Sequence, residues 1–301
     1  MLTPYVIGVD LGGTHLRAAL ADGSGRLLAQ LDERTRADLV EQLERVIGEL
    51  ATVQAGPRVA RTVIGGAGVP DGNDSLSHAP NLTLSPGVAL ARLLSERVGH
   101  PVTLENDVNV AAVGELYDGV GRTHRDFVVV SVGTGIGAGV VLDGRLVRGT
   151  RGAAGEIGYL PLGTDPLDPA HHTHGALEEI ASGRGMARRY TELTGDEVPA
   201  VTIFERAEHG DTDAREIIDD AARWTAGALA SLVAVLDPGI AVLAGGIGSR
   251  QDFHDRVVAW LPRFGAELPI VQSHVVDGAP LRGAVRLALD LHRSVQNGAV
   301  S

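Results

Sequence analysis

The sequence predicts an α/β protein made of two similar halves around a central cleft. Apolar runs of strand length alternate with longer segments whose apolar residues have helical spacing, a pattern typical of sheets covered by helices. The 301 residues include 40 glycines and only 3% aromatic residues. The core must therefore be built from Val, Leu, Ile and Ala, with many close backbone approaches, which also suits this architecture.

The third observation is an internal repeat. Strand, glycine turn, strand, Asp-Gly hairpin and strand follow one another twice, and superposing Gly12 on Gly133 also superposes Asp22 on Asp143. The predicted strands are Tyr5–Val9, His15–Ala21 and Arg26–Leu31 in the first copy, and Phe127–Val132, Gly137–Leu142 and Arg145–Val147 in the second. Two homologous halves are expected to present their glycine turns to each other across the cleft.

The rest of the chain supplies helices and single strands. Helical spacing predicts helices over Thr35–Thr52, Gly87–Val98, Val108–Tyr117, Met186–Leu193, Ile203–His209, Asp213–Leu236 and Leu281–Val295, and another that Gly245-Gly246 opens. Apolar runs predict strands over Ala60–Ala67, Val102–Leu104 and Ile240–Ala244. We expect one domain from residues 1–117 plus the final helix at 284–301, and a second from residues 118–283.

The charged residues favour small-molecule chemistry. The formal net charge is −12, and because nucleic acids and anionic membranes bind dense cationic surfaces, we expect neither as a partner. All 26 cationic residues are Arg. The absence of Lys excludes a Walker-A loop, a Schiff-base lysine and a PLP enzyme. Phosphate must therefore be bound by backbone N–H groups, Arg, hydroxyls or a metal.

The sequence contains no cysteine, which excludes disulfides, thiolate metal sites and cysteine nucleophiles. No charged-then-apolar signal segment precedes the first strand, and no apolar run is long enough to cross a bilayer. We therefore expect a cytoplasmic protein.

The first glycine turn follows a carboxylate. Asp10 ends a buried strand directly before Gly12, Gly13 and Thr14. Such a turn lets backbone N–H groups and the Thr14 hydroxyl approach phosphate oxygens, and a carboxylate beside phosphates implies a cation between them. We expect Asp10 to hold Mg²⁺, directly or through water. The alternative is a structural turn that begins with Asp.

The second glycine turn consists of Gly133, Thr134 and Gly135. Because the chain has no Lys, the N–H groups and hydroxyl of this turn are the expected cradle for the remaining phosphates of a nucleotide. The repeated frame strengthens this interpretation.

Three polar residues, Glu105, Asn106 and Asp107, follow the short strand Val102–Leu104 and precede a helix. This is the carboxyl end of a strand, where α/β proteins bind ligands. The alternative for Asp107 is an N-cap, a position that favours Asp. A cap accounts for one residue only, so we interpret the group as a site.

Two glutamates complete a candidate substrate site. Glu156 lies in a glycine-rich loop, and Glu178 begins a helix about twenty residues later. Together with Asn106 and Asp107 they suit a polyhydroxylated substrate, because carboxylates form strong hydrogen bonds with vicinal hydroxyls. The alternative for each glutamate is a solvated surface charge.

Three histidines, His171, His172 and His174, lie close together in the loop Gly163–Gly175. A metal site is one interpretation. The residues lack a fixed ligand spacing, so we interpret the segment as a solvated loop.

The ordered motifs resemble the ROK family of repressors and sugar kinases, within the actin-like and hexokinase-like superfamily. The matching stretches are Gly8–Thr14, Glu105–Ala112, Val132–Gly139, Gly155–Gly158, and Leu236-Asp237-Pro238 followed by Gly245-Gly246. They cover nearly the whole chain in the family's order, which is far more specific than any single motif.

The resemblance implies two actin-like, ribonuclease H-like domains around the cleft, and ATP and Mg²⁺ as donor and cofactor. It implies that Asp107 is the general base and that Asn106, Glu156 and Glu178 bind sugar hydroxyls. Asn81 falls where the family often has a further sugar-side residue, and Gly245 and Gly246 would lie against the adenosine. The resemblance also implies a homodimer or homotetramer.

The chain departs from the family pattern at Tyr159, where most members have a His that touches sugar, and in lacking the cysteine-rich zinc motif that follows. We therefore expect Tyr159 at the sugar, no zinc site and a differently organised loop at Gly163–Gly175. The expected function is ATP-dependent phosphorylation of a hexose, with glucose as the first candidate. Mannose, fructose or an N-acetylhexosamine are alternative acceptors. A sugar-binding regulator without kinase activity is the other alternative, although ROK repressors carry an N-terminal helix-turn-helix domain and this chain begins its first strand at Tyr5.

Overall fold

The computed structural model describes residues 4–53, 58–70, 76–77, 89–275 and 278–296, and the chain divides into two compact units. The first contains Met1–Thr123, Arg148–Ala153 and His274–Ser301, and the second contains His124–Val147 and Ala154–Ser273. The C-terminal segment of the first unit begins at His274, ten residues before the boundary expected at residue 284. The first unit also includes the short stretch Arg148–Ala153. Among the described residues, no helix combines the length and apolarity needed to cross a membrane.

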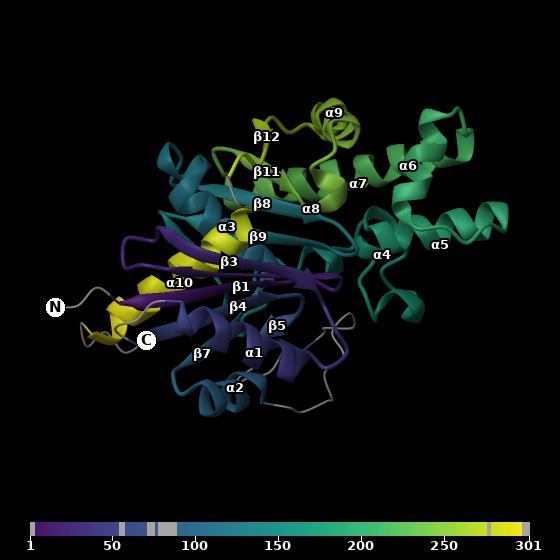
Figure 1. Ribbon diagram of the computed structural model, residues 1–301. Helices are drawn as coiled ribbons and strands as arrows, with labels where there is room; N and C mark the ends of the chain where they lie inside the picture. Colours follow the sequence, from purple (N-terminus) through teal and green to yellow (C-terminus); the bar gives the residue numbers. More distant parts are fainter. Residues whose placement is uncertain (1–3, 54–57, 71–75, 78–88, 276–277, 297–301) are drawn as a thin grey trace. The chain divides into compact units, whose positions relative to one another are not determined.

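The first unit is built on a five-stranded mixed sheet (Figure 1). Its strands, in the order in which they pair, are β3 (Leu27–Arg34), β2 (His15–Ala21), β1 (Tyr5–Leu11), β4 (Val59–Gly66) and β7 (Val102–Asn106). The first two pairings are antiparallel and the other two are parallel. The parallel strands β1, β4 and β7 therefore end at one edge of the sheet. A short two-stranded ribbon pairs β5 (Val69–Pro70) with β6 (Leu76–Ser77).

The side chains of β1 point alternately to the two faces of this sheet. Ile7, Val9 and Leu11 belong to a buried cluster with apolar residues of α1 (Leu39–Thr52) and α2 (Leu90–Val98). Asp10 and Gly8 point to the opposite face because successive side chains alternate. On that face, β1 packs against α10 (Ala279–Gln296), drawn in yellow in Figure 1.

Glycines let α10 pack closely on the strand and on α3 (Asp107–Asp118), which is followed by the 3₁₀ turn η1 (Val120–Arg122). A Cβ on Gly8 would lie 2.7 Å from the backbone nitrogen of Val285, and one on Gly283 would lie 1.6 Å from the carbonyl oxygen of Val110. Larger residues at either position would force the two helices and the strand apart. The C-terminal helix therefore completes the core of the N-terminal part of the chain.

The second unit repeats the sheet of the first. Its strands pair in the order β10 (Arg145–Val147), β9 (Ile136–Leu142), β8 (Phe127–Val132), β11 (Ala241–Ala244) and β12 (Ile270–Gln272). Again the first two pairings are antiparallel and the other two parallel. The duplication expected from the sequence is confirmed at the level of strand order and direction. The strand β12, with three half-buried residues, carries too little apolar pattern to have been predicted.

The helices of the second unit enclose a separate buried cluster. They are α4 (Glu178–Ala181), α5 (Gly183–Thr194), α6 (Ala200–Glu208), α7 (Thr212–Leu236), α8 (Gly245–Gly248) and α9 (Gln251–Trp260), with 3₁₀ turns η2 (Ile157–Tyr159), η3 (Pro169–His171) and η4 (Leu261–Phe264). The single helix expected after Gly245 is instead the one-turn α8 followed by α9. Residues Ile217, Ala221 and Leu232 of the predicted apolar stripe on α7 are buried.

Candidate active site

In the first unit, polar residues gather where three parallel strands end. The sheet register aligns Asp10 of β1 with Gly65 of β4, and Gly65 with Glu105 of β7. Asp107 begins α3 directly after β7. The negative charge of Asp107 raises the pKa of Asp10, so the two carboxylates lie close enough to interact.

Gly65 also fixes the position of α3. A Cβ at Gly65 would lie 2.4 Å from a methyl group of Val110, which is fully buried in the first turn after Asp107. Any side chain at position 65 would push this helix away from the sheet. The glycine therefore determines how closely Asp107 approaches the strand ends.

The helix cap is Asn106, so the alternative that Asp107 is the N-cap is wrong. The side-chain oxygen of Asn106 accepts hydrogen bonds from the backbone N–H groups of Val108 (2.9 Å) and Asn109 (3.1 Å), and its amide nitrogen donates to the carbonyl of Gly68 at 3.1 Å. Two orphan N–H groups of the helix are satisfied in this way. Asn106 keeps one N–H with which it can bind a ligand.

Asp107 is the first residue of α3, and one of its carboxylate oxygens accepts a hydrogen bond from the backbone N–H of Val108 at 2.8 Å. Burial raises its pKa, and the hydrogen bonds from backbone N–H groups oppose that shift only in part. A carboxylate with a raised pKa has a higher proton affinity. That property suits a general base.

Asp10 shows the same effect. Burial raises its pKa to about 6, Arg17 lowers it, and the negative charges of Asp107 and Asp32 raise it further. Arg17 is the cross-strand partner of Asp10, and Asp32 is the cross-strand partner of Arg17. The charge of Asp107 thus disfavours ionisation of Asp10, and a cation beside Asp10 would offset this repulsion.

Asp10 fits a magnesium ion. Its carboxylate forms no hydrogen bond with another residue that the structure describes, so both oxygens remain available. Within the same residues, no group of three His, Cys, Asp or Glu side chains forms a closed metal cage. Mg²⁺ does not require one, because it binds through one or two carboxylates, waters and substrate phosphates.

The turn of Gly12, Gly13 and Thr14 is anchored to a neighbouring segment. The hydroxyl of Thr35 donates to the carbonyl of Gly12 at 2.7 Å, and the N–H of Thr35 donates to the carbonyl of Thr14 at 3.0 Å. The Thr14 side chain is exposed and its hydroxyl lies 3.2 Å from Nδ1 of His15. The turn is therefore fixed and its hydroxyl is exposed, and the phosphate contact stays a prediction.

Glu105 is a buried residue whose role sequence reasoning missed. One of its carboxylate oxygens accepts from the side-chain amide of Asn109 at 3.0 Å, and the other accepts from Nε of Arg148 at 2.6 Å. Its side chain is therefore directed inward and supports the helix that carries Asp107. The apolar residues before Glu105 hinted at burial, but the sequence did not indicate its partner Arg148.

In the second unit, the turn of Gly133, Thr134 and Gly135 is anchored by the beginning of α5. The N–H of Gly183 donates to the carbonyl of Gly133 at 2.8 Å, and the N–H of Arg184 donates to the carbonyl of Thr134 at 3.2 Å. Both glycine turns of the molecule thus have carbonyls held by a neighbouring segment. In each, the threonine side chain is exposed.

The two predicted nucleotide elements of this unit meet at one sheet edge. The register pairs Ala244 of β11 with Ser131 of β8, so Gly245 and the turn at Gly133 follow adjacent parallel strands. Gly245 has a φ of +81°, and a Cβ there would lie 2.5 Å from the carbonyl oxygen of Val132. Only glycine allows this close approach without strain.

A cavity of about 610 Å³ opens beside these elements. It is lined by Gly133, Thr134 and Gly246 together with Gly183, Arg184, Ala187, Pro199, Ala200, Val201, Phe204, Ile247 and Arg250. Its wall is mostly apolar and carries two arginines. This combination suits a ligand with a flat apolar ring and anionic groups.

Glu178 lies against the second glycine turn. One carboxylate oxygen accepts a hydrogen bond from the N–H of Ile136 at 3.0 Å, and the other pairs with Arg184. A Cβ on Gly135 would lie 2.8 Å from this carboxylate. The Glu178 side chain is only 18% exposed, so the alternative of a solvated surface charge is wrong for this residue.

Electrostatics relate Glu178 to the other predicted sugar residues of this unit. Burial raises the pKa of Glu178. The pKa of Tyr159 is raised by burial and by the negative charges of Glu156 and Glu178. These three side chains therefore lie close enough to interact. Asn81, the remaining predicted sugar residue, lies outside the described residues.

Hydrogen bonds hold the loop that contains the three histidines. The Tyr159 hydroxyl donates to the carbonyl of Thr173 at 3.1 Å, and the Thr164 hydroxyl donates to the carbonyl of Ala176 at 3.0 Å. Asp168 caps η3, and Nδ1 of His171 lies 2.7 Å from the carbonyl of Asp165. The Tyr159 side chain thus supports this loop. The absence of zinc stays a prediction.

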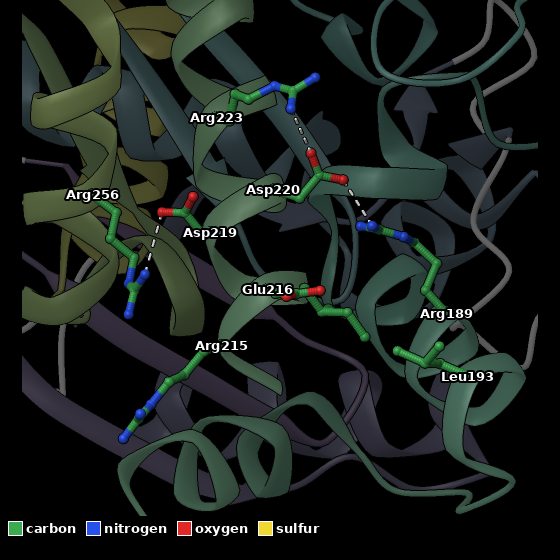
Figure 2. Close-up of a pocket in the computed structure, with 9 residues that line it drawn as sticks. Arg189, Leu193, Arg215, Glu216, Asp219, Asp220, Arg223 and Arg256 are labelled. Carbon is green, nitrogen blue, oxygen red and sulfur yellow. Dashed lines mark hydrogen bonds and ion pairs between the residues drawn. The ribbon is translucent and has the colours of Figure 1, made fainter. Parts of the chain in front are cut away.

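A second cavity, of about 530 Å³, lies between α5, α7 and α9 (Figure 2). In this view Arg189 and Arg223 point toward Asp220, at 2.7 and 3.5 Å, and Arg256 points toward Asp219, at 3.3 Å. Three arginines and two aspartates are thus paired in the wall of this cavity.

Comparisons with known proteins identify related sequences. A model of the ROK family matches residues 6–291. The glucokinase of Thermotoga maritima is 31% identical over 94% of this chain and 96% of that protein. The N-acetyl-D-glucosamine kinase of Pectobacterium carotovorum is 31% identical over 94% of this chain and 98% of that protein.

Solved structures have the same fold. A ROK hexokinase from Thermus thermophilus superposes with a TM-score of 0.82 at 32% identity, covering 96% of this chain and 99% of that chain. A ROK glucokinase from Streptomyces griseus, in complex with glucose and AMPPNP, gives a TM-score of 0.76 at 28% identity, covering 95% of this chain and 99% of that chain. The predicted family and the predicted actin-like α/β fold are confirmed.

Proposed function

This chain belongs to the ROK family and is a sugar kinase, and we propose that it transfers the γ-phosphoryl group of ATP to a hydroxyl of a hexose, with glucose as the first candidate. The observation that carries the proposal is the half-buried Asp107 at the start of α3, whose pKa is raised and which interacts with Asp10 at the end of β1.

Asp107 supplies the base. In the proposed reaction its free carboxylate oxygen accepts the proton of the attacking hydroxyl. The sugar oxygen then forms a bond to the γ-phosphorus, the bond from that phosphorus to the bridging oxygen breaks, and ADP leaves with the electron pair. The protein contributes orientation and charge stabilisation, which are the main requirements of phosphoryl transfer.

Asp10 is the proposed ligand of Mg²⁺, directly or through a water molecule. The ion would neutralise negative charge on the phosphates. The free oxygens and raised pKa of Asp10 support this role. Gly12, Gly13 and Thr14 are the proposed phosphate contacts of the first unit.

The second unit is proposed to bind the nucleotide and part of the sugar. Gly133, Thr134 and Gly135 would contact phosphates, and Gly245 and Gly246 would border the adenosine in the cavity that Gly246 lines.

Six polar side chains are the proposed partners of the sugar hydroxyls. The proposed contacts are Asn81, Asn106, Asp107, Glu156, Tyr159 and Glu178. Their identity as hydrogen-bonding groups suits a polyhydroxylated acceptor.

The hexose itself is the finer part of the proposal. Relatives are named glucokinase and N-acetyl-D-glucosamine kinase at equal identity. A screen of ADP release over glucose, mannose, fructose, N-acetylglucosamine and N-acetylmannosamine would identify the acceptor. Binding of a sugar without turnover on any of the five would favour a sugar-binding regulator instead. A homodimer or homotetramer in the cytoplasm is proposed from the family alone.

The base is tested by Asp107→Asn, which keeps the shape of the side chain but cannot accept a proton. We expect kcat to fall by about 10²-fold or more while the sugar still binds. A matched control is Asp143→Asn in the exposed hairpin between β9 and β10, where φ is +51° and Asn is tolerated. Near-normal kcat in Asp107→Asn, with sugar affinity measured in parallel, would contradict the assignment.

A further inference from the structure

The nucleotide cavity needs a cation, and the chain can supply only arginine. The sequence contains no Lys among its 26 cationic residues. A nucleotide brings several negative charges to the turn of Gly133 and Thr134, and Mg²⁺ neutralises only part of them. Two arginines line this cavity, Arg184 and Arg250.

Arg250 is committed to other partners. Its Nε donates to Asp252 at 3.0 Å, and a terminal nitrogen donates to Glu208 at 2.9 Å. Its guanidinium also stacks on the ring of Phe204, 4.3 Å from the ring centre. Two carboxylates and an aromatic face therefore hold Arg250 in the wall of the cavity.

Arg184 is placed differently. Its backbone N–H donates to the carbonyl of Thr134 at 3.2 Å, so the residue is attached to the glycine turn itself. Its side chain is 33% exposed, lines the cavity and forms an ion pair with Glu178 through one terminal nitrogen. A guanidinium has five N–H donors, so this pair leaves most of them for a ligand.

Glu178 fixes the direction of Arg184. Its carboxylate is held between the turn and η2 by the N–H of Ile136 and by close packing against Gly135 and Gly158. Because the Glu178 carboxylate is fixed, the guanidinium of Arg184 that pairs with it is held close to the turn. The guanidinium is thus oriented before a nucleotide arrives.

We propose that Arg184 is the residue that binds the phosphates of the donor nucleotide at the second glycine turn, and that Glu178 positions it there. This inference rests on the proposed kinase function and goes beyond it, because it assigns the phosphate cation of a lysine-free site. Arg184 performs no proton transfer. Its effect is on the binding of negative charge.

The test compares ligands that differ only in phosphate. Calorimetry would measure the affinities of ADP, AMP and adenosine, with Mg²⁺ present throughout, for the wild type, Arg184→Gln and Arg184→Lys. We expect Arg184→Gln to weaken ADP binding by about 10- to 100-fold, as for hydrogen bonds to a charged group. Adenosine affinity should change by less than about twofold, and Arg184→Lys should recover part of the loss because it keeps the charge.

Arg188→Gln is the matched control. Arg188 lies one turn further along α5, pairs with Glu179 and Glu192, and does not line the cavity. The Arg188→Gln variant should bind ADP with the affinity of the wild type. The adenosine measurement also reports whether each variant keeps its folded cavity.

Two results would overturn the inference. One is an ADP affinity of Arg184→Gln equal to that of the wild type. The other is an equal loss of ADP and adenosine binding, which would make Arg184 a structural support of the turn. If the wild type itself bound neither ADP nor adenosine, the proposed kinase function would fail first, so the two failures are distinguishable.

Discussion

At the scale of single residues, burial distinguishes three carboxylates of the candidate site from the other acidic side chains. The chain has 38 acidic residues, and most of them are solvated or paired with arginine. Asp10, Asp107 and Glu178 of the candidate site each have a pKa raised by burial, and Glu178 is also paired with Arg184. Each is held at the end of a strand or beside a glycine turn, where close backbone packing removes water from the side chain.

The raised pKa of Asp10 predicts a pH-dependent effect of magnesium. A carboxyl whose pKa is higher in the folded state stabilises the fold below its unfolded pKa of about 3.9, and that contribution is lost as the pH rises through about 6. Above about pH 6 the buried charge is unfavourable, and Mg²⁺ should compensate for it. We expect Mg²⁺ to raise the Tm of the ADP-saturated protein more at pH about 7.5 than at pH about 5.

Asp10→Asn provides the control for this prediction. The amide has no charge to neutralise, so the variant should show a smaller magnesium effect that no longer depends on pH in this range. A Tm increase as large and as pH-dependent as that of the wild type would place the ion elsewhere.

At the scale of elements, the position of one helix depends on glycine. The start of α3 carries the cap Asn106 and the proposed base Asp107, and Gly65 lets this helix lie close to β4. Glu105 and Asp118 support the two ends of the helix, the first through Arg148 and the second through Arg282 and Arg286 of α10. The position of the proposed base therefore depends on packing outside the motif itself.

Substitution of Gly65 by Ala should displace α3. The new Cβ would lie 2.4 Å from Val110, and relief of this overlap should cost about 1–3 kcal/mol of stability. Because Asp107 moves with the helix, kcat should fall more than the affinity for nucleotide. Urea denaturation and steady-state kinetics would measure both effects.

Gly48→Ala is the matched control. Gly48 lies on the exposed side of α1, and a Cβ there meets no atom within 4 Å. Alanine should stabilise this helix by up to about 1 kcal/mol without changing kcat. If Gly65→Ala behaved like Gly48→Ala, the close packing of α3 would not control the base.

At the scale of the whole molecule, the chain contains two units that each have their own sheet and buried cluster. The first unit is discontinuous in sequence, because α10 returns from the C-terminus to pack on β1 and α3. Its stability therefore requires residues separated by almost the full length of the chain.

A charge in α10 should unfold the first unit selectively. Leu281 is 2% exposed, so Leu281→Asp would bury an unpaired carboxylate, at a cost above about 4 kcal/mol. We expect faster amide hydrogen exchange in β1, β4 and α3, while β8, β11 and α7 keep their protection. Val295 lies on the exposed side of the same helix and is 68% exposed, so Val295→Asp should leave hydrogen exchange unchanged in both units. Equal loss of protection in both units would mean that they unfold as one.

The sequence by itself determined the repeated sheet pattern, most helices, the two glycine turns and the family, because these depend on local periodicity, on turn residues and on ordered motifs. It also identified Asp10, Asp107, Glu156 and Glu178 as candidates, since carboxylates after apolar strands or in glycine loops are unusual. Among the alternatives it left open were a cap at Asp107 and a surface charge at Glu178.

Only the tertiary structure resolved those alternatives. It assigned the cap to Asn106, directed Glu105 inward to Arg148, and placed Glu178 between the second glycine turn and Arg184. It also showed that Gly65 controls the approach of α3 to the sheet. These features arise from contacts between residues far apart in the chain, and a single sequence carries no local signal for such contacts. Burial, which shifts the carboxylate pKa values, likewise exists only once the chain has packed.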